Sequence, residues 1–203
     1  MSNPVQGILQ TADDFFAKGE FREASRKYLE VLRIQSDHPV ALHHLGLCCY
    51  RTGSHEQARN LIFQSVSIQQ NNAVAHDHLG VVLVALNDFI HAEASFKSAI
   101  AIQPSYVDAY HNLGALLIKQ KHYSRALAIL ESSPSTPKGA LSRHKLLGQT
   151  HLLLGNTDQA LTHLEQALMQ RSSDPDVLSD IATALEKQSR HSEALKFHSL
   201  AIG

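Results

Sequence analysis

The chain contains 203 residues, with 18 Lys and Arg against 19 Asp and Glu, 14 His, two Cys and no Trp. A hydrophobic fraction of 43% and a charged fraction of 18% are typical of a globular protein and exclude a disordered or membrane-embedded chain. The formal net charge of -1 at pH 7 argues against a protein that binds nucleic acid mainly through basic side chains.

The amino-terminal segment lacks the features of an export signal. A secretory signal needs a basic start and an uninterrupted apolar run, and this chain has neither before the acids Asp13 and Asp14. No window approaches the roughly 20 apolar residues that span a bilayer. The only cysteines, Cys48 and Cys49, are neighbours and cannot build a disulfide framework. We therefore expect a cytoplasmic protein without a membrane partner, with Asp13 and Asp14 solvated and Cys49 in the core.

The sequence repeats itself every 34 residues. The pair Leu45-Gly46 recurs at that interval as Leu79-Gly80, Leu113-Gly114 and Leu147-Gly148. The same interval divides the chain into six repeats, at residues 5–38, 39–72, 73–106, 107–140, 141–174 and 175–203. The eighth residue of every repeat is Gly or Ala. The twentieth is Ala in all six, namely Ala24, Ala58, Ala92, Ala126, Ala160 and Ala194.

Each repeat predicts two helices. Apolar residues recur at helical spacing in two stretches, which a short polar or Gly-containing turn separates, as at Gly53 in the second repeat. A small residue in the middle of each helix lets the paired backbones approach closely. Large residues at another shared position fill the remaining space: Tyr28, Ile62, Phe96, Leu130 and Leu164. One such hairpin cannot bury both of its faces, so neighbours must stack. We predict an all-α solenoid of about twelve helices in antiparallel pairs, forming a single domain over residues 1–203.

One segment departs from this pattern, and so does the end of the chain. Residues 132–139 read Ser-Ser-Pro-Ser-Thr-Pro-Lys-Gly, and their two prolines predict that a helix stops near Glu131 or Ser132. A solvated loop, a hinge and a partner-contacting loop all remain open for this segment. The sequence ends directly after the last predicted helix, without the polar cap that solenoids usually carry. Self-association through the last repeat and continuation into a larger protein are the two expectations.

These features resemble the tetratricopeptide repeat (TPR) family. The 34-residue period, the Leu-Gly pair, the constant Ala, the large residue four positions later and Pro104 carry the resemblance, which covers residues 5–203. The aromatic residue usual at the fourth position occurs only as Tyr110, and the closing proline only as Pro104. The resemblance implies a right-handed superhelix. It also implies a non-catalytic scaffold whose first helices line a concave groove that binds a peptide or helix of another protein.

The resemblance implies that the fifth, sixth, ninth, twelfth and thirteenth residues of each repeat face this groove. The candidate peptide-binding residues are His43, His44, Leu47, Tyr50, Asp77, His78, Val81, Val84, His111, Asn112, Ile118, Lys145 and Gln149. Apolar residues at the ninth position disfavour the carboxylate clamp of chaperone-binding relatives, and only Asn112 matches the asparagine ladder of O-GlcNAc transferases. The groove would have an apolar floor that includes Leu47, Val81 and Leu152, and an imidazole-rich rim.

The sequence offers little for catalysis. It contains no Gly-rich phosphate loop, no nucleophile elbow and no Cys–His pair in a recognisable context, so no catalytic residue, cofactor or metal is expected. The alternative function is an amino-terminal substrate-recognition array of a larger enzyme. Residues 37–46 look like the arrays that precede glycosyltransferase or sulfotransferase domains.

The histidines are the unusual part of the composition. No two of them are spaced i,i+3 or i,i+4, so one helix cannot chelate a metal with them. Sites shared between repeats stay open, because His44 and His78 occupy equivalent positions. Six histidines fall at the start of first helices, namely His43, His44, His76, His78, His111 and His144. Imidazoles titrate near pH ~6.5, so we expect ligand affinity to change between pH 7.5 and 5.5.

Overall fold

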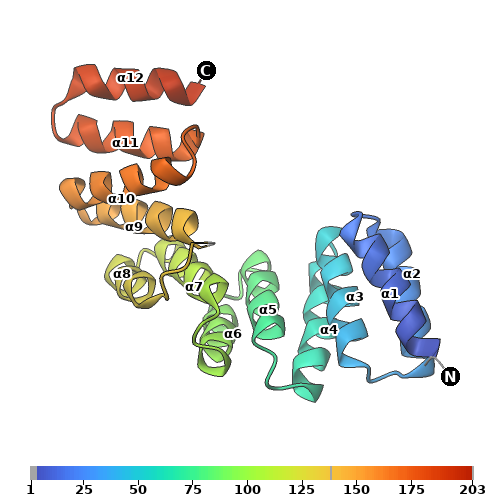
Figure 1. Ribbon diagram of the computed structural model, residues 1–203. Helices are drawn as coiled ribbons and strands as arrows, with labels where there is room; N and C mark the ends of the chain where they lie inside the picture. Colours follow the sequence, from blue (N-terminus) through green and yellow to red (C-terminus); the bar gives the residue numbers. More distant parts are fainter. Residues whose placement is uncertain (1–3, 138, 203) are drawn as a thin grey trace. The chain divides into compact units, whose positions relative to one another are not determined.

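The computed structural model describes residues 4–137 and 139–202, and within them every regular element is an α-helix (Figure 1). Twelve helices follow one another in antiparallel pairs, one pair for each predicted repeat, so the all-α solenoid prediction is confirmed. By its internal contacts the chain divides into two compact units, Met1–Gln103 and Pro104–Gly203, here called the N-terminal and C-terminal halves. The single domain expected from the sequence stays a prediction.

The N-terminal half contains the first three repeats. Its helices are α1 (Pro4–Ala17), α2 (Phe21–Ile34), α3 (Pro39–Arg51), α4 (His55–Ile68), α5 (Ala73–Ala85) and α6 (Phe89–Ile102). Each helix packs against the next, and the first helices α3 and α5 also touch each other. Several helix starts are encoded locally: Asn72, for example, accepts the Ala75 amide at 3.1 Å through its side chain and caps α5.

The C-terminal half contains the last three repeats. Its helices are α7 (Val107–Lys119), α8 (Tyr123–Ser132), α9 (Ala140–Leu154), α10 (Thr157–Gln170), α11 (Pro175–Lys187) and α12 (His191–Ile202). Here too each helix packs against its successor, and the first helices α7, α9 and α11 form a continuous row of contacts. That row presents the face on which the sequence placed its candidate residues.

A small residue faces a large one inside the helix pairs. A Cβ atom built on Gly80 would lie 2.5 Å from the Phe96 ring, and one built on Gly46 would lie 2.5 Å from Ile62. Gly114 and Gly148 meet Leu130 and Leu164 in the same way. The constant alanines at the twentieth position are all buried. The eighth residue is therefore kept small because the partner helix carries a large side chain directly against it.

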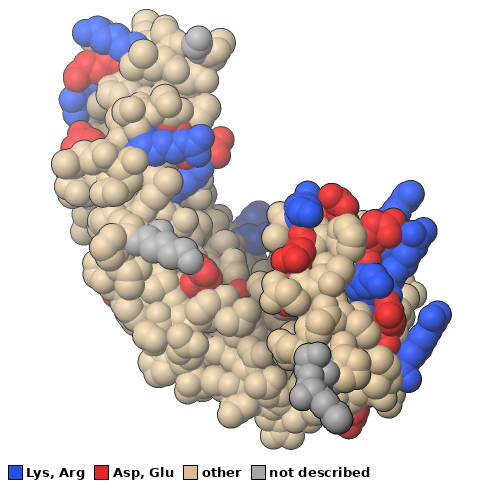
Figure 2. Space-filling view, turned by 45° about the vertical axis from the view of Figure 1, so that its right-hand side comes forward, with Lys and Arg blue, Asp and Glu red and all other residues tan. Residues whose placement is uncertain are grey.

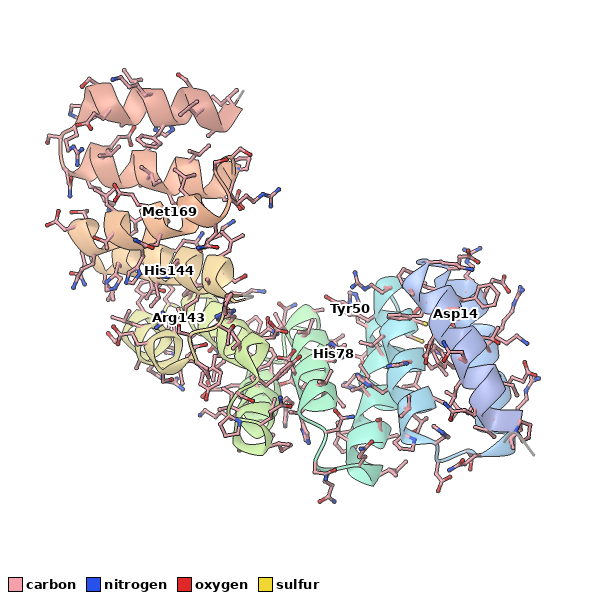
Figure 3. The ribbon with its side chains drawn as sticks, viewed as in Figure 1. Asp14, Tyr50, His78, Arg143, His144 and Met169 are labelled. Carbon is pink, nitrogen blue, oxygen red and sulfur yellow. The ribbon has the colours of Figure 1, made fainter. Side chains whose placement is uncertain are left out.

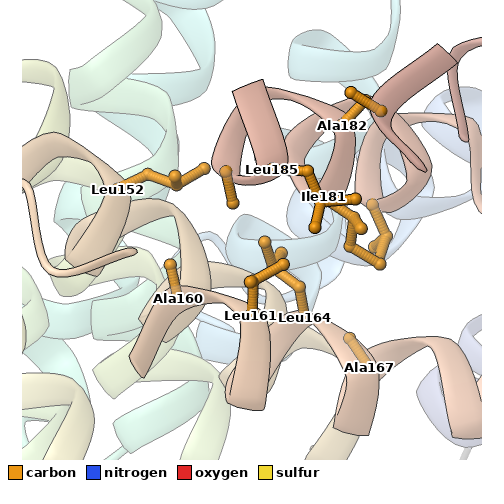
Figure 4. Packing of buried hydrophobic residues seen from close by; sticks show 11 residues of the cluster. Leu152, Ala160, Leu161, Leu164, Ala167, Ile181, Ala182 and Leu185 are labelled. Carbon is orange, nitrogen blue, oxygen red and sulfur yellow. The ribbon is translucent and has the colours of Figure 1, made fainter. Parts of the chain in front are cut away.

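Each half has its own apolar core. In the C-terminal half, Leu152, Leu161 and Leu164 meet Ile181 and Leu185 between α9, α10 and α11 (Figure 4). In the N-terminal half, apolar side chains of α1, α2 and α3 form a core in which Tyr28 is fully buried. The expectation for Cys49 was wrong by one position, because Cys48 is the buried cysteine and Cys49 is half-exposed.

The turn inside each repeat contains one residue with a positive φ angle. It is the fifteenth residue in all six repeats: Gly19, Gly53, Asn87, Lys121, Gly155 and Ser189. Glycine adopts this left-handed conformation without steric cost, whereas Asn87, Lys121 and Ser189 adopt it with a β-carbon. The conformation therefore belongs to the turn and is imposed even where the sequence does not supply glycine.

The Ser- and Pro-rich segment ends α8 at Ser132, as predicted. The backbone carbonyls at the end of α8 find a donor in the next repeat: the Arg143 guanidinium donates to Leu130 O at 3.2 Å and to Glu131 O at 3.3 Å. Ser133 is buried in the same region. Of the residues in this segment, Lys138 lies outside the described ranges. Within residues 4–137 and 139–202, no helix combines the length and the apolar character that a membrane span requires.

Candidate functional site

The first helices of the N-terminal half carry the candidate residues of the second and third repeats. On α3 these are His43, His44, Leu47 and Tyr50, and on α5 they are Asp77, His78, Val81 and Val84; Tyr50 and His78 are labelled in Figure 3. Two of the set are buried, His43 with 5% of its surface exposed and Asp77 with 3%. The others are half-buried.

His43, His44 and His78 form a cluster, called here the N-terminal histidine cluster. His43 Nε2 lies 2.8 Å from His78 Nδ1, which joins the second and third repeats. His44 Nδ1 lies 3.0 Å from Asp13 Oδ1, and the Tyr28 hydroxyl donates to that same oxygen at 2.6 Å. The expectation of a merely solvated Asp13 was wrong, because this carboxylate links α1 to α2 and α3.

This environment disfavours charge on His43. Burial, together with the neighbouring His78 and His44, lowers the pKa of His43 to about 3. Burial and Asp13 raise the pKa of the Tyr28 hydroxyl above its usual range. His43 is therefore neutral across the range from pH 7.5 to 5.5, in which the sequence had suggested a change of charge.

A second cluster lies in the C-terminal half and joins α9 to α10. It consists of His144, His151 and His163, here the C-terminal histidine cluster, beside Arg143, which is labelled with His144 in Figure 3. The His163 ring stacks on His151 at 5.4 Å between centroids, with 6° between the planes. Burial and the neighbouring His144 and His151 lower the pKa of His163 to about 4. Burial also lowers the pKa values of His144 and His151.

Of the candidate residues in the fourth repeat, one is buried and two are half-buried. His111 is buried, and its ring lies against Gly139, where a β-carbon would come within 3.2 Å of His111 Cε1. Burial lowers the pKa of His111. Asn112 and Ile118 are half-buried on the same helix, α7. Of these three residues, Ile118 lines a cavity.

That cavity, of about 480 Å³, opens on the row of first helices in the C-terminal half and is called here the C-terminal cavity. Its lining residues come from α7, α9 and α11: Ile118, Gln149, Leu152, Leu153, Asp180, Thr183 and Lys187. All of them occupy the sixth, ninth, twelfth or thirteenth position of their repeat. The geometry thus brings the candidates Ile118 and Gln149 together.

Lys145, the remaining candidate of the fifth repeat, bridges to the sixth. Its ammonium group lies 2.7 Å from Asp176 Oδ2 and 3.3 Å from Asp174 Oδ1. Burial alone would lower the pKa of Lys145, but these two carboxylates outweigh it and raise the pKa. Asp174 also caps α11 by accepting from the Asp176 and Val177 amides. Lys145 therefore ties α9 to the start of α11 beside the cavity.

Asp180, Thr183 and Lys187 are cavity residues that the sequence reasoning missed. The groove positions were read only for the second to fifth repeats, whereas these residues are the sixth, ninth and thirteenth of the last repeat. Extending the same positions by one repeat would have found them. Burial raises the pKa of Asp180, although Gln149 and Lys145 partly oppose the shift.

Another cavity, of about 460 Å³, lies in the N-terminal half on a different face. It lies over α5 between the second helices α4 and α6, and Phe63, Val66, Leu79 and Leu83 contribute its apolar surface. Phe63 is 60% exposed there. None of the candidate residues lines this second-helix cavity. It is thus a second apolar surface that a partner can cover.

The charged side chains are mixed in sign on the surface of the C-terminal half (Figure 2). Over the last two repeats, uppermost in Figure 2, Lys and Arg side chains are interspersed with Asp and Glu side chains. Among the described residues, no group of three or more His, Cys, Asp or Glu side chains has a geometry that could hold a metal ion.

Comparisons with known proteins identify relatives of this architecture. Two sequence models of the tetratricopeptide repeat match, one over residues 83–148 and the other over residues 9–73 and 145–202. Curated protein sequences gave no significant match.

Solved structures of low sequence identity share the fold. PilW, a type IV pilus biogenesis factor, has a TM-score of 0.86 at 20% identity, with 98% of this chain and 92% of PilW covered. MamA from Desulfovibrio magneticus RS-1 has a TM-score of 0.73 at 19% identity, over 82% of this chain and 94% of MamA. YrrB, described as having an unusual peptide-binding site, has a TM-score of 0.69 at 16% identity, over 86% and 90%.

Proposed function

Since the chain belongs to the tetratricopeptide repeat family, we propose that it is a non-catalytic scaffold that binds a segment of another protein on its first-helix face. The observation that carries this proposal is the C-terminal cavity. Every residue that lines it occupies a position that the family resemblance assigns to the binding groove. A cavity of that size, with an apolar floor and a few polar groups, suits the side chains of a bound peptide or helix.

Two further observations support peptide or helix binding. Leu153 remains 49% exposed at the cavity, so apolar surface is available for a partner to cover. YrrB, which shares the fold, is described as a TPR protein with an unusual peptide-binding site. In the N-terminal half, the groove candidates Leu47, Val81 and Val84 are half-buried on the first helices α3 and α5.

Comparative capture from native lysate tests the proposal. Wild-type protein and an Ile118→Glu variant would be immobilised, and bound proteins quantified by mass spectrometry. The Ile118→Glu variant should capture at least tenfold less of each specific partner, because the new carboxylate on the cavity floor must be desolvated beneath an apolar side chain. Circular dichroism would verify that the variant stays helical.

Two matched variants interpret the result. Ile90→Glu makes the same change at an exposed isoleucine of α6 and should leave capture intact. Phe63→Glu places the charge in the second-helix cavity. If Phe63→Glu abolishes capture and Ile118→Glu does not, the binding face is the second-helix cavity and the present proposal is wrong.

A further inference from the structure

The C-terminal cavity is electrically asymmetric. Asp174 at the N-cap of α11 and Asp176 and Asp180 on that helix all interact with the Lys145 ammonium. Lys145 is already engaged, at 2.7 Å from Asp176 and 3.3 Å from Asp174. Asp180 is the member of this group that lines the cavity. The end of the cavity at Asp180 therefore carries an excess of negative charge.

The pairing of Asp180 is incomplete. Gln149 donates a hydrogen bond to this carboxyl, but Oδ2 is buried and has no partner among the residues that the structure describes. The carboxyl group of Asp180 at the cavity wall therefore has unused acceptor capacity, and a cationic donor suits it best because its hydrogen bonds are charge-assisted. Burial is the main cause of the raised pKa of Asp180, and the neighbouring Asp176 and Asp174 add to it.

The rest of the cavity is suited to an aliphatic group. Ile118, Leu152 and Leu153 supply apolar surface from α7 and α9. Lys187, the other charged residue of the lining, follows Asp180 on α11 by seven residues, about 10 Å along the helix axis. Asp180 and Lys187 thus leave α11 two turns apart, and the aliphatic side chains of the lining come from the other two helices.

We propose that the C-terminal cavity holds a partner segment that presents a Lys or Arg side chain beside an aliphatic side chain. The cation pairs with Asp180, and the aliphatic group covers Leu153 and Ile118. This inference rests on the proposed function and specifies its ligand. An acidic tail is a poor occupant, since its carboxylates would meet the excess negative charge of Asp174, Asp176 and Asp180.

A peptide library provides the test. Acetylated and amidated octapeptides from a positional-scanning library would be screened against wild-type protein, Asp180→Asn and the control Glu165→Gln, an exposed carboxylate on α10. Wild type and Glu165→Gln should select Lys or Arg next to Leu, Ile, Val or Met. Asp180→Asn should lose the preference for the cation and keep the preference for the aliphatic residue.

Individual selected peptides would then be measured by fluorescence anisotropy. Replacing the cationic residue by norleucine should weaken binding to wild type by at least tenfold and leave binding to Asp180→Asn unchanged. Binding to wild type should also weaken more steeply between 50 and 300 mM NaCl than binding to Asp180→Asn. Circular dichroism checks folding, and Asp180→Ser replaces Asp180→Asn if the amide variant does not fold.

The outcomes separate this inference from the proposed function. Selection of peptides without a cationic preference, or a cationic preference that persists in Asp180→Asn, overturns the role of Asp180 and leaves peptide binding supported. Failure of wild type to select any peptide overturns both proposals.

Discussion

The Nδ1 atoms of His144 and His163 lie 3.1 Å apart. At that distance one nitrogen donates and the other accepts, so the pair needs at least one neutral imidazole. His151 stacks on the same His163 ring, its Nδ1 is buried without a partner among the described residues, and the nearby charges are Arg143 on α9 and Glu131 at the end of α8. The C-terminal histidine cluster therefore resists protonation.

Acid should destabilise the protein through this cluster. The folded pKa of His163 is about 4, below the value of about 6.5 expected in the unfolded chain. The unfolded state then binds protons first, so the stabilisation is complete above pH 6.5 and is lost as the pH falls toward 4. The urea concentration at the unfolding midpoint should decrease as the pH is lowered from 7.5 to 4.5. His163→Gln should weaken this dependence, with the remainder due to groups such as His43, and the exposed control His191→Gln should leave it unchanged. A midpoint independent of pH would contradict the prediction.

Enlarging Gly80 should cost stability despite the better helix propensity of alanine. A methyl group there would lie 2.5 Å from the Phe96 ring, and overpacking of this kind costs about 1–3 kcal/mol. Gly80→Ala should therefore lower the free energy of unfolding in urea, and Phe96→Leu in the same chain should recover part of the loss. Gly7→Ala is the matched control, since nothing lies within 4 Å of its added β-carbon. Equal effects of the two glycine variants would show that the close contact is unimportant.

Replacing Lys121 by glycine should stabilise the protein. Its φ angle is 64°, a conformation that costs a residue with a β-carbon about 1–2 kcal/mol. Because glycine also gains freedom in the unfolded chain, Lys121→Gly should raise stability by only about 0.5–1 kcal/mol. Gly53→Ala, at the equivalent position of the second repeat with a φ of 83°, should act in the opposite direction. Thermal unfolding of both variants checks the two signs.

Asp174 should contribute more to stability than Asp176, although both bind Lys145. Asp174 is buried and caps α11 through two backbone amides, whereas the Asp176 side chain is 75% exposed. Loss of a helix cap costs about 0.5–2 kcal/mol, and an exposed ion pair contributes about 0–1 kcal/mol. Asp174→Ala should therefore lower the urea midpoint clearly, and Asp176→Ala only slightly. The reverse order would show that the ion pair dominates.

The fold could be predicted from the sequence because its main determinants lie within one repeat. Gly80 and Phe96, or Gly148 and Leu164, are 16 residues apart and recur at a fixed interval, so their steric relation is visible in the sequence. The end of α8 was predictable for a similarly local reason, since proline cannot continue a helix.

The site was less predictable because its chemistry depends on contacts between distant residues. Asp13 and His44 are 31 residues apart, and nothing in either sequence position indicates their 3.0 Å contact. Helical spacing assigned the core cysteine to Cys49, and the rotation of α3 buries Cys48. The number of histidines likewise does not reveal which of them are buried: His43, whose pKa burial lowers to about 3, does not change charge between pH 7.5 and 5.5, while the expected change in ligand affinity stays a prediction.

The contact between a glycine and a large side chain, which recurs at Gly46 and Ile62 and at Gly114 and Leu130, lies entirely inside one repeat. A repeat that is duplicated or moved within the gene therefore carries both complementary parts with it. The array can lengthen or shorten by whole repeats without compensating substitutions inside the neighbouring hairpins. Variation between repeats can then concentrate on the first-helix face, where a change alters recognition and leaves the helix pair intact.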